Sequence, residues 1–190
     1  MSPLPRLLSG STGSASMQSS DSVSQRSGYS FTCSEDKTMR RALPGDIATL
    51  VALMAEFYAE SDYGLDQELA ERAFAAILSD ERLGYVWLID DEAKVVGYVV
   101  LTLRFGMEYG GLMACIDDLF VVPQSRNRGL TRAALVQVCD FCKTIDVRAI
   151  TVEVSHSNGS AQTVYRRLGL AEAPDRQILA LALASPARVV

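Results

Sequence analysis

The chain has 190 residues, of which 48% are hydrophobic and 22% are charged, a mixture typical of a folded globular protein. No apolar run reaches about 18 residues, the length that indicates a membrane-spanning helix, so we expect no membrane partner. The net charge of −5 argues against a nucleic-acid-binding protein, because such proteins usually carry a basic stripe.

The cysteines point to buried thiols and not to a metal centre. The chain contains four cysteines but a single histidine, His156, so a mixed Cys and His zinc site is disfavoured and we expect no metal. Cys115 falls in an expected strand, and Cys139 and Cys142 lie three positions apart in an expected helix. Thiols in such positions favour a reducing compartment, and we expect a cytoplasmic protein.

Residues 1–36 differ in composition from the rest of the chain. They are rich in serine and glycine and show almost no apolar periodicity, so they could bury too little surface to offset the entropy of folding. We expect a disordered N-terminal extension over 1–36 and one folded domain over 37–190. The alternative for this extension is an organelle transit peptide, which would also be rich in serine and poor in acids.

The first half of the domain alternates between strand and helix patterns. A short strand is expected first, followed by a turn in which Asp46 caps a helix, then a second helix and a pair of strands joined by a hairpin loop. The expected ranges are strand 38–42, helix 47–58, helix 66–78, strand 85–89 and strand 95–104.

The second half continues with a central strand and two strand–helix units. Strands and helices in this order predict a mixed α/β sheet flanked by helices. The expected ranges are strand 112–122, a helix that opens at 127–130 and ends near 143, strand 148–154, helix 158–168 and a last strand 177–183.

Residues 115–135 form the most informative stretch. An apolar strand stops at Pro123, a polar loop with two arginines follows, and a helix then begins. The first N–H groups of a helix lack internal acceptors and lie at the positive end of its dipole, so they bind anions. Gly129 has no Cβ and allows close approach, while Arg126 and Arg128 add charged donors. The stretch predicts a pyrophosphate site.

The order Asp-Asp-Leu-Phe-Val-x-Pro, then Arg-x-x-Gly-x and an apolar helix, resembles the acetyl-coenzyme A signature of the GNAT superfamily of N-acetyltransferases. Residues 158–170, Asn-Gly-Ser-Ala-Gln-Thr-Val-Tyr-Arg-Arg-Leu-Gly-Leu, resemble the second motif of that superfamily. Thr131 departs from the pattern, which usually has Gly or Ala there. The resemblance spans about residues 38–183 and implies the GNAT fold, a mostly antiparallel mixed sheet whose central strands splay apart.

The resemblance also implies roles for particular residues. Tyr165 corresponds to the tyrosine that protonates the departing thiolate, and Asp117 to an acid that binds the amine or acts as its base. Because Asp117 and Asp118 are adjacent in a strand, we expect them to point to opposite faces. The residues expected to hold acetyl-CoA are Leu119, Phe120, Val121, Arg126, Asn127, Arg128, Gly129, Leu130, Thr131, Arg132 and Asn158.

The expected acceptor is a primary amine of a small molecule. Residues 107–111 and 117–121 look like the diamine, polyamine and thialysine branch of the superfamily, and Asp117, Glu108, Tyr58 and Glu60 are the residues expected to bind the amine. The alternatives are a protein N-terminal or lysine acetyltransferase, and a sensor that binds acetyl-CoA without turnover, which the Thr131 departure favours. The resemblance further implies a homodimer.

Overall fold

The structure is a computed structural model, and it describes residues 39–60, 63–173, 177–179, 181 and 183. The chain divides into two units, Met1–Glu35 and Asp36–Val190, and every described residue belongs to the second. The N-terminal extension expected over residues 1–36 therefore lies outside the described residues.

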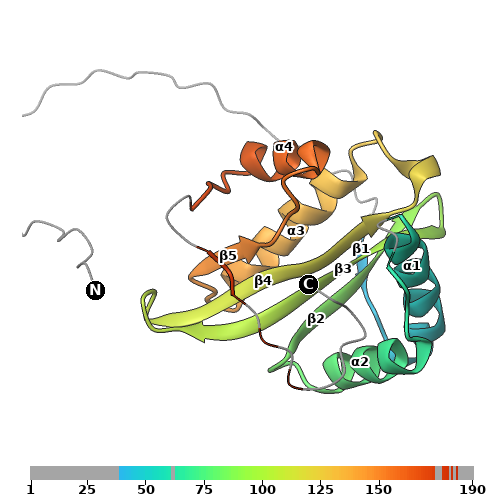
Figure 1. The fold of residues 1–190 in the computed structure, drawn as a ribbon, viewed down its shortest axis with the longest axis horizontal. Helices are drawn as coiled ribbons and strands as arrows, with labels where there is room; N and C mark the ends of the chain where they lie inside the picture. Colours follow the sequence, from blue (N-terminus) through green and yellow to red (C-terminus); the bar gives the residue numbers. More distant parts are fainter. Residues whose placement is uncertain (1–38, 61–62, 174–176, 180, 182, 184–190) are drawn as a thin grey trace, which may run out of the picture. The chain divides into compact units, whose positions relative to one another are not determined.

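A five-stranded sheet forms the body of the second unit (Figure 1). Its strands follow the order β1-β2-β3-β4-β5, and every neighbouring pair is antiparallel except β4 and β5, which are parallel. The predicted mixed α/β sheet is confirmed. In chain order the elements are β1 (Met39–Arg41), the 3-10 turn η1 (Pro44–Asp46), α1 (Ile47–Ala59), α2 (Gln67–Ser79), β2 (Gly84–Asp91), β3 (Lys94–Gly106), β4 (Gly111–Val121), the 3-10 turn η2 (Pro123–Ser125), α3 (Leu130–Thr144), β5 (Ala149–Val152) and α4 (Gly159–Arg167).

Helices cover both faces of the sheet, α1 and α2 on one and α3 and α4 on the other (Figure 1). Alternate residues of β2 supply both cores, because successive side chains of a strand point to opposite faces. Trp87 and Ile89 pack in the α3 layer, whereas Val86 and Leu88 pack with α1 and α2. The sheet is therefore a buried central layer, so a functional site is expected at the strand ends and connecting loops.

The last expected strand, 177–183, is not present among the described residues of that range. Residues 177–179, 181 and 183 are not in a strand, and the remaining positions lie outside the described residues. The apolar side chains of Leu179 and Leu181 are exposed, so the apolar pattern that predicted a buried strand is not matched by burial here. Within the described residues, no helix has both the length and the apolar character needed to cross a membrane.

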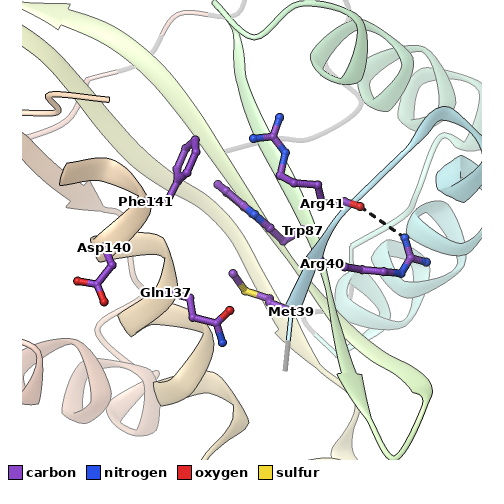
Figure 2. Close-up of a pocket in the computed structure, with 7 residues that line it drawn as sticks. All are labelled: Met39, Arg40, Arg41, Trp87, Gln137, Asp140 and Phe141. Atoms are coloured by element: carbon purple, nitrogen blue, oxygen red, sulfur yellow. Dashed lines mark hydrogen bonds between the residues drawn. The ribbon is translucent and has the colours of Figure 1, made fainter. Parts of the chain in front are cut away.

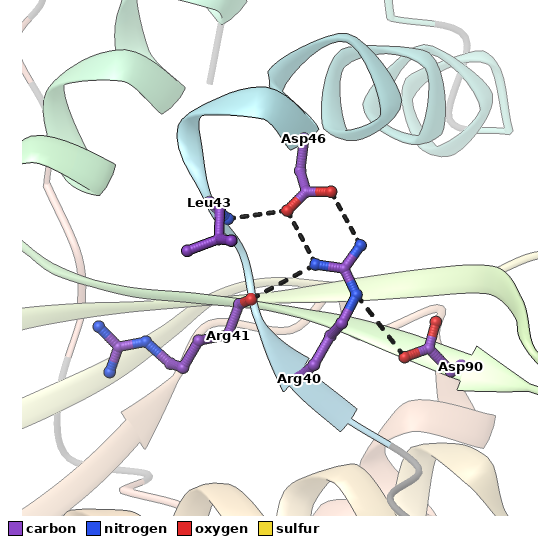
Figure 3. Close-up of polar contacts among 5 residues, drawn as sticks. All are labelled: Arg40, Arg41, Leu43, Asp46 and Asp90. Carbon is purple, nitrogen blue, oxygen red and sulfur yellow. Dashed lines mark hydrogen bonds and ion pairs between the residues drawn. The ribbon is translucent and has the colours of Figure 1, made fainter.

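An ion pair holds the corner between β1 and α1 (Figure 3). Arg40 donates to both carboxylate oxygens of Asp46 at 2.8 Å, and Asp46 also accepts the N–H of Leu43 at 2.8 Å. Asp46 is the N-cap residue of α1, as predicted, but its side chain makes no capping hydrogen bond to that helix: the carboxylate instead reaches back to the chain before the turn. The Arg40 hydrogen bond lowers the pKa of Asp46 to about 2.

Candidate active site

The parallel pair β4 and β5 separates halfway along β4. The last paired residues are Ile116 and Val152, and β4 then continues to Val121 with no ladder partner on its β5 side among the described residues. The splay that the sequence resemblance implied is therefore present. Over residues 117–121 that edge of β4 has no strand neighbour among the described residues, as a ligand that lies between two strands would require, although the Val121 carbonyl accepts a hydrogen bond from Arg126.

A β-bulge lies where the splay begins. On the β3 side, Leu101 pairs with Ile116 but Val100 pairs with Asp118, so Asp117 is an extra residue in β4. Ile116 packs in the α3 layer, and Asp118 lies beside Tyr98 of the opposite core, although a regular strand would put residues two apart on one face. The alternation used to place Asp117 and Asp118 on opposite faces therefore does not hold.

The two aspartates differ in environment. Asp117 is exposed, whereas only 7% of Asp118 is exposed and its carboxylate accepts a hydrogen bond from the Tyr98 hydroxyl at 3.0 Å. A buried carboxylate needs such donors, because desolvation penalises its charge. Tyr98 was missed by sequence reasoning, since a tyrosine inside an apolar strand looks like any other core residue. Asp117 is thus the aspartate that solvent and a soluble amine reach directly.

The loop after β4 turns sharply before α3. Asn127 and Gly129 have φ values of 61° and 82°, in the left-handed region, and Gly129 is the N-cap residue of α3. A Cβ placed on Gly129 would meet no atom within 4 Å, so open space lies above this main chain. Glycine is favoured here by the backbone conformation, and its lack of a side chain leaves that space free for an anion.

Helix α3 begins one residue later. The first N–H that bonds within this helix belongs to Ala133, which donates to the Gly129 carbonyl at 2.9 Å. The N–H groups of Leu130, Thr131 and Arg132 therefore precede the first intrahelical bond, at the positive end of the dipole. The residues present fit a pyrophosphate, as the sequence predicted.

Both loop arginines contact carboxylates on other elements. Arg128 pairs with Asp91 and Glu92 in the β2–β3 hairpin. Arg126 donates to both carboxylate oxygens of Glu60 and, through Nε, to the Val121 carbonyl. The structure thus brings Arg126 and Glu60 together, although the sequence assigned the first to the cofactor and the second to the amine.

Tyr165 of α4 lies in the core on the α3 side of the sheet. Only 8% of it is exposed, and burial raises its pKa to about 12, with the nearby Cys115 of β4 adding to the shift. The phenol is therefore protonated at neutral pH and keeps a hydrogen to donate. Because Cys115 precedes the bulge by two residues, the Tyr165 side chain belongs to the part of the fold where β4 and β5 begin to separate.

Asn158 caps the helix that carries Tyr165. Its side chain accepts the N–H of Ala161 at 3.1 Å and the hydroxyl of Ser160 at 3.0 Å, as a helix N-cap does. Its predicted role, contact with the cofactor, is not tested by these bonds. Asn158 thus fixes where α4 begins and, through it, the position of Tyr165.

Aromatic residues gather where α1 ends against β4. Phe57 lies 5.5 Å from the Phe120 ring, and Tyr58 lies 6.4 Å from the Tyr63 ring. Tyr58 and Phe120 are buried and share the α1 and α2 core with Tyr98. Tyr58 and Glu60 therefore lie on the same side of the sheet as Asp118, as one wall of an acceptor site requires.

Glu108 does not join that group. It lies in the turn between β3 and β4, before Gly111, whereas Asp117 is six residues further along β4. Six strand residues span roughly 20 Å, so Glu108, before the start of β4, and Asp117, just past its middle, lie far apart. The sequence placed them in one site because they are close in the chain, but an extended strand separates them.

A shallow cavity of about 510 Å³ lies elsewhere, at the β1 edge of the sheet (Figure 2). Met39 and Trp87 line it from β1 and β2, and Phe141 from α3. The Arg41 guanidinium lies 4.2 Å from the Tyr85 ring centre and 5.4 Å from that of Trp87, so it packs on these two rings. Three strands separate this edge from the β4–β5 splay, so the cavity is not part of the candidate site.

The described residues contain no candidate metal centre. Within the part of the chain that the structure describes, no group of three or more His, Cys, Asp or Glu side chains is arranged to hold an ion. Cys115, Cys139 and Cys142 are free thiols, and burial raises the pKa of Cys142 to about 11.

Comparison with known proteins gives a consistent family. The model of the Acetyltransferase (GNAT) family matches residues 50–170. The uncharacterized N-acetyltransferase YhfO of Bacillus subtilis (strain 168) is 24% identical over 137 residues, which is 70% of this chain and 89% of YhfO.

Solved structures share the fold. The integron cassette protein HFX_CASS3, from the mobile metagenome of Cole Harbour Salt Marsh, is 45% identical with a TM-score of 0.72, over 78% of this chain and 92% of that one. Aminoglycoside N-acetyltransferase AAC(6')-Iy in complex with CoA has 17% identity and a TM-score of 0.65, over 77% of this chain and 94% of that one. With its splayed strands and its family match over residues 50–170, the chain belongs to the acetyltransferase (GNAT) family, the acetyl-CoA-dependent N-acetyltransferases.

Proposed function

We propose that this enzyme moves the acetyl group of acetyl-CoA to a primary amine of a small molecule by direct attack of the amine. The observation that supports the proposal most strongly is the continuous course of the chain from the free β4 edge to the open N-terminus of α3. That course offers main-chain donors along residues 117–121 and again at 129–132. An exposed carboxylate, Asp117, stands at its start.

For the cofactor we assign main-chain groups first. The N–H groups at Gly129, Leu130, Thr131 and Arg132 would hold the pyrophosphate, because a helix N-terminus needs no charged side chain to bind an anion. The free edge at Leu119, Phe120 and Val121 would hold the pantetheine arm and polarise the thioester carbonyl. We propose Asn127, Arg128 and Asn158 as further contacts of acetyl-CoA, which supplies an activated acyl group.

Asp117 would receive the proton of the amine. A primary amine with a pKa of about 10.4 costs roughly 4.6 kcal/mol to deprotonate at pH 7, and a carboxylate near it relays that proton directly or through water. Asp117 is exposed beside the splay, so a cationic amine reaches it without desolvating the buried Asp118. The same negative charge attracts the amine in its cationic form.

Tyr165 would donate its hydrogen to the thiolate of coenzyme A as the carbon–sulfur bond breaks. Its raised pKa keeps the phenol protonated throughout the physiological range, and its position near Cys115 puts it by the splay. The capped α4 holds the ring in place, so the donor is preorganised.

The acceptor itself is proposed to be a di-cationic or polycationic amine, as in the polyamine and thialysine branch. The aromatic wall at Tyr58 and Tyr63 would cover its methylenes and attract its charges, and Glu60 adds a carboxylate to that wall. Glu108 is too far along the hairpin to serve the same amine. The aminoglycoside named for the structural neighbour AAC(6')-Iy is also a polar amine, which favours the small-molecule class.

The test is a turnover assay with three probes. Purified protein is mixed with acetyl-CoA and with spermidine, thialysine or kanamycin, and release of free thiol is followed. We expect stimulation by at least one probe. Acetyl-CoA binding with no stimulation by any of them would overturn the small-amine proposal. Acetylation of peptide N-termini or lysines in the same assay would instead favour a protein substrate.

We also propose a cytoplasmic location, on the thiols that favour a reducing compartment, and a homodimer, on the family resemblance alone. Light scattering after size-exclusion chromatography tests the assembly, with twice the 20.6 kDa mass of one chain expected. A single-chain mass at micromolar concentration would contradict it.

A further inference from the structure

We propose that Arg126 is a positioning residue for the acceptor, which fixes the end of α1 to the end of β4. The inference rests on the proposed function, because it concerns how the amine site of that enzyme is held. It gives Arg126 a role different from the phosphate contact that its place in the loop motif suggests.

The contacts of the Arg126 side chain lead away from the N-terminus of α3. Its Nη2 donates to the two carboxylate oxygens of Glu60 at 2.6 and 2.8 Å. Its Nε donates to the Val121 carbonyl, the last residue of β4, at 2.7 Å. One guanidinium therefore joins two elements whose contacting residues, Glu60 and Arg126, are 66 positions apart in the chain.

Aromatic packing restricts the same side chain. The Arg126 guanidinium lies 5.5 Å from the Phe120 ring centre, and that ring lies 5.5 Å from Phe57 of α1. The ion pair alone would be weak, because Arg126 and Glu60 are 40% and 38% exposed. Combined with the Val121 bond and the ring contacts, it holds a rigid planar group in one orientation.

The consequence concerns the wall of the acceptor site. Glu60 follows the last turn of α1, and Tyr63 just beyond it donates its N–H to the Tyr58 carbonyl at 3.0 Å while its ring contacts that of Tyr58. Fixing Glu60 therefore fixes the aromatic wall relative to the β4 edge where the thioester would lie. The amine and the thioester are thereby kept in a fixed relative position, whereas the cofactor itself is held by main-chain groups.

The experiment compares four variants, Arg126→Gln, Arg126→Lys, Glu60→Gln and the Arg126→Gln/Glu60→Gln double, with Arg82→Gln as a matched control. Arg82 also pairs with a carboxylate, Asp80, but lies outside the site. Calorimetry measures the acetyl-CoA Kd, and thiol release measures kcat and KM for whichever of spermidine, thialysine and kanamycin the wild type turns over. Deuterium exchange of the amides of residues 63–66 measures directly how firmly the segment that carries Tyr63 is held.

We expect both Gln variants and the double to raise the amine KM by a similar factor, about fivefold or more, because residues that act through one another are not additive. The acetyl-CoA Kd should stay within about twofold of wild type, residues 63–66 should exchange faster, and Arg126→Lys should lose less than Arg126→Gln. A weaker acetyl-CoA Kd in Arg126→Gln with a tighter one in Glu60→Gln would overturn the inference, because Glu60 would then merely compete with phosphate.

Failure of the proposed function gives a different result. If the wild type acetylates none of the three probes, that function fails, and the positioning role is decided by exchange alone. Faster exchange at 63–66 in both single variants, with no further rise in the double, supports the tie between α1 and β4. Unchanged exchange in both overturns it.

Discussion

The two halves of the candidate site are built in different ways. The cofactor half runs through one continuous segment, from the free edge of β4 through the Asn127 and Gly129 turn to the first turn of α3, and its proposed contacts are main-chain groups. The acceptor half assembles side chains of separate segments, such as Tyr58, Tyr63 and Glu60 with its partner Arg126, which meet only in the folded chain. A main-chain site depends on backbone conformation, whereas a side-chain site changes with each substitution.

This difference suggests how the enzyme could keep its cofactor while its substrate changes. Substitutions on α1 would alter the aromatic wall without moving the α3 N-terminus, because the two lie on separate elements. We therefore expect variants to separate into those that affect acetyl-CoA binding and those that affect the amine.

The largest expected effect is on the cofactor half. Gly129→Glu adds a side chain and a negative charge to the open space above the turn, so we expect the acetyl-CoA Kd measured by calorimetry to rise by about 100-fold or more. Gly110→Glu is the matched control, because Gly110 also has a positive φ, 62°, and open space above it, but lies in the β3–β4 turn. Equal loss in both variants would mean that backbone strain, and not the anion site, causes the effect.

Tyr165→Phe tests the chemical step that joins the two halves. Loss of a general acid typically costs about 100-fold, so we expect kcat to fall by roughly that factor while the acetyl-CoA Kd stays near wild type. Tyr85→Phe is the control, since Tyr85 is equally buried, at 8% exposed, in the same core. Parallel loss of turnover and cofactor affinity in Tyr165→Phe would show a packing residue and not an acid.

Asp117→Asn should act on the amine alone. Removing the carboxylate charge removes both attraction for the cation and a proton acceptor, so we expect kcat/KM for the amine to fall about tenfold at pH 7. Asp140→Asn, at an exposed position of α3, should leave it unchanged. Weaker acetyl-CoA binding in Asp117→Asn, in place of an effect on the amine, would contradict the separation of the site into two halves.

The smallest expected effect concerns the ion pair of Arg40 and Asp46, which lies outside both halves of the site. The pKa of Asp46 lies near 2, below its usual value of about 3.9, so its contribution to stability is complete above the usual value and is lost as pH falls through the lowered one. We expect the wild type to lose about 1 kcal/mol more unfolding free energy than Asp46→Asn between pH 5 and pH 2. Urea titrations at both pH values measure this, and identical losses would contradict it.

The sequence predicted the local structure of the cofactor half better than that of the acceptor half, for a physical reason. Pro123, Gly129 and the start of α3 are neighbours in the chain, so local rules for turns and helix ends apply to them directly. The family motif added the splay of β4 and β5, which composition and periodicity could not reveal.

The acceptor half depends on features that local patterns do not contain. A single inserted residue, Asp117, breaks the alternation on which its side was judged, and nothing in the apolar run indicates a bulge. Arg126 and Glu60 are 66 positions apart, so their pairing appears only in the folded chain. Glu108 is the opposite case. It is close to Asp117 in the sequence, but the extended strand between them separates the two residues in space.

Hydrogen–deuterium exchange with and without acetyl-CoA tests the central claim most directly. If the thioester lies along the β4 edge with its pyrophosphate at the α3 N-terminus, amides of residues 117–121 and 129–132 should exchange more slowly when it is bound. Amides of the β3–β4 turn should be unaffected. No binding, or protection confined to other parts of the chain, would contradict the account.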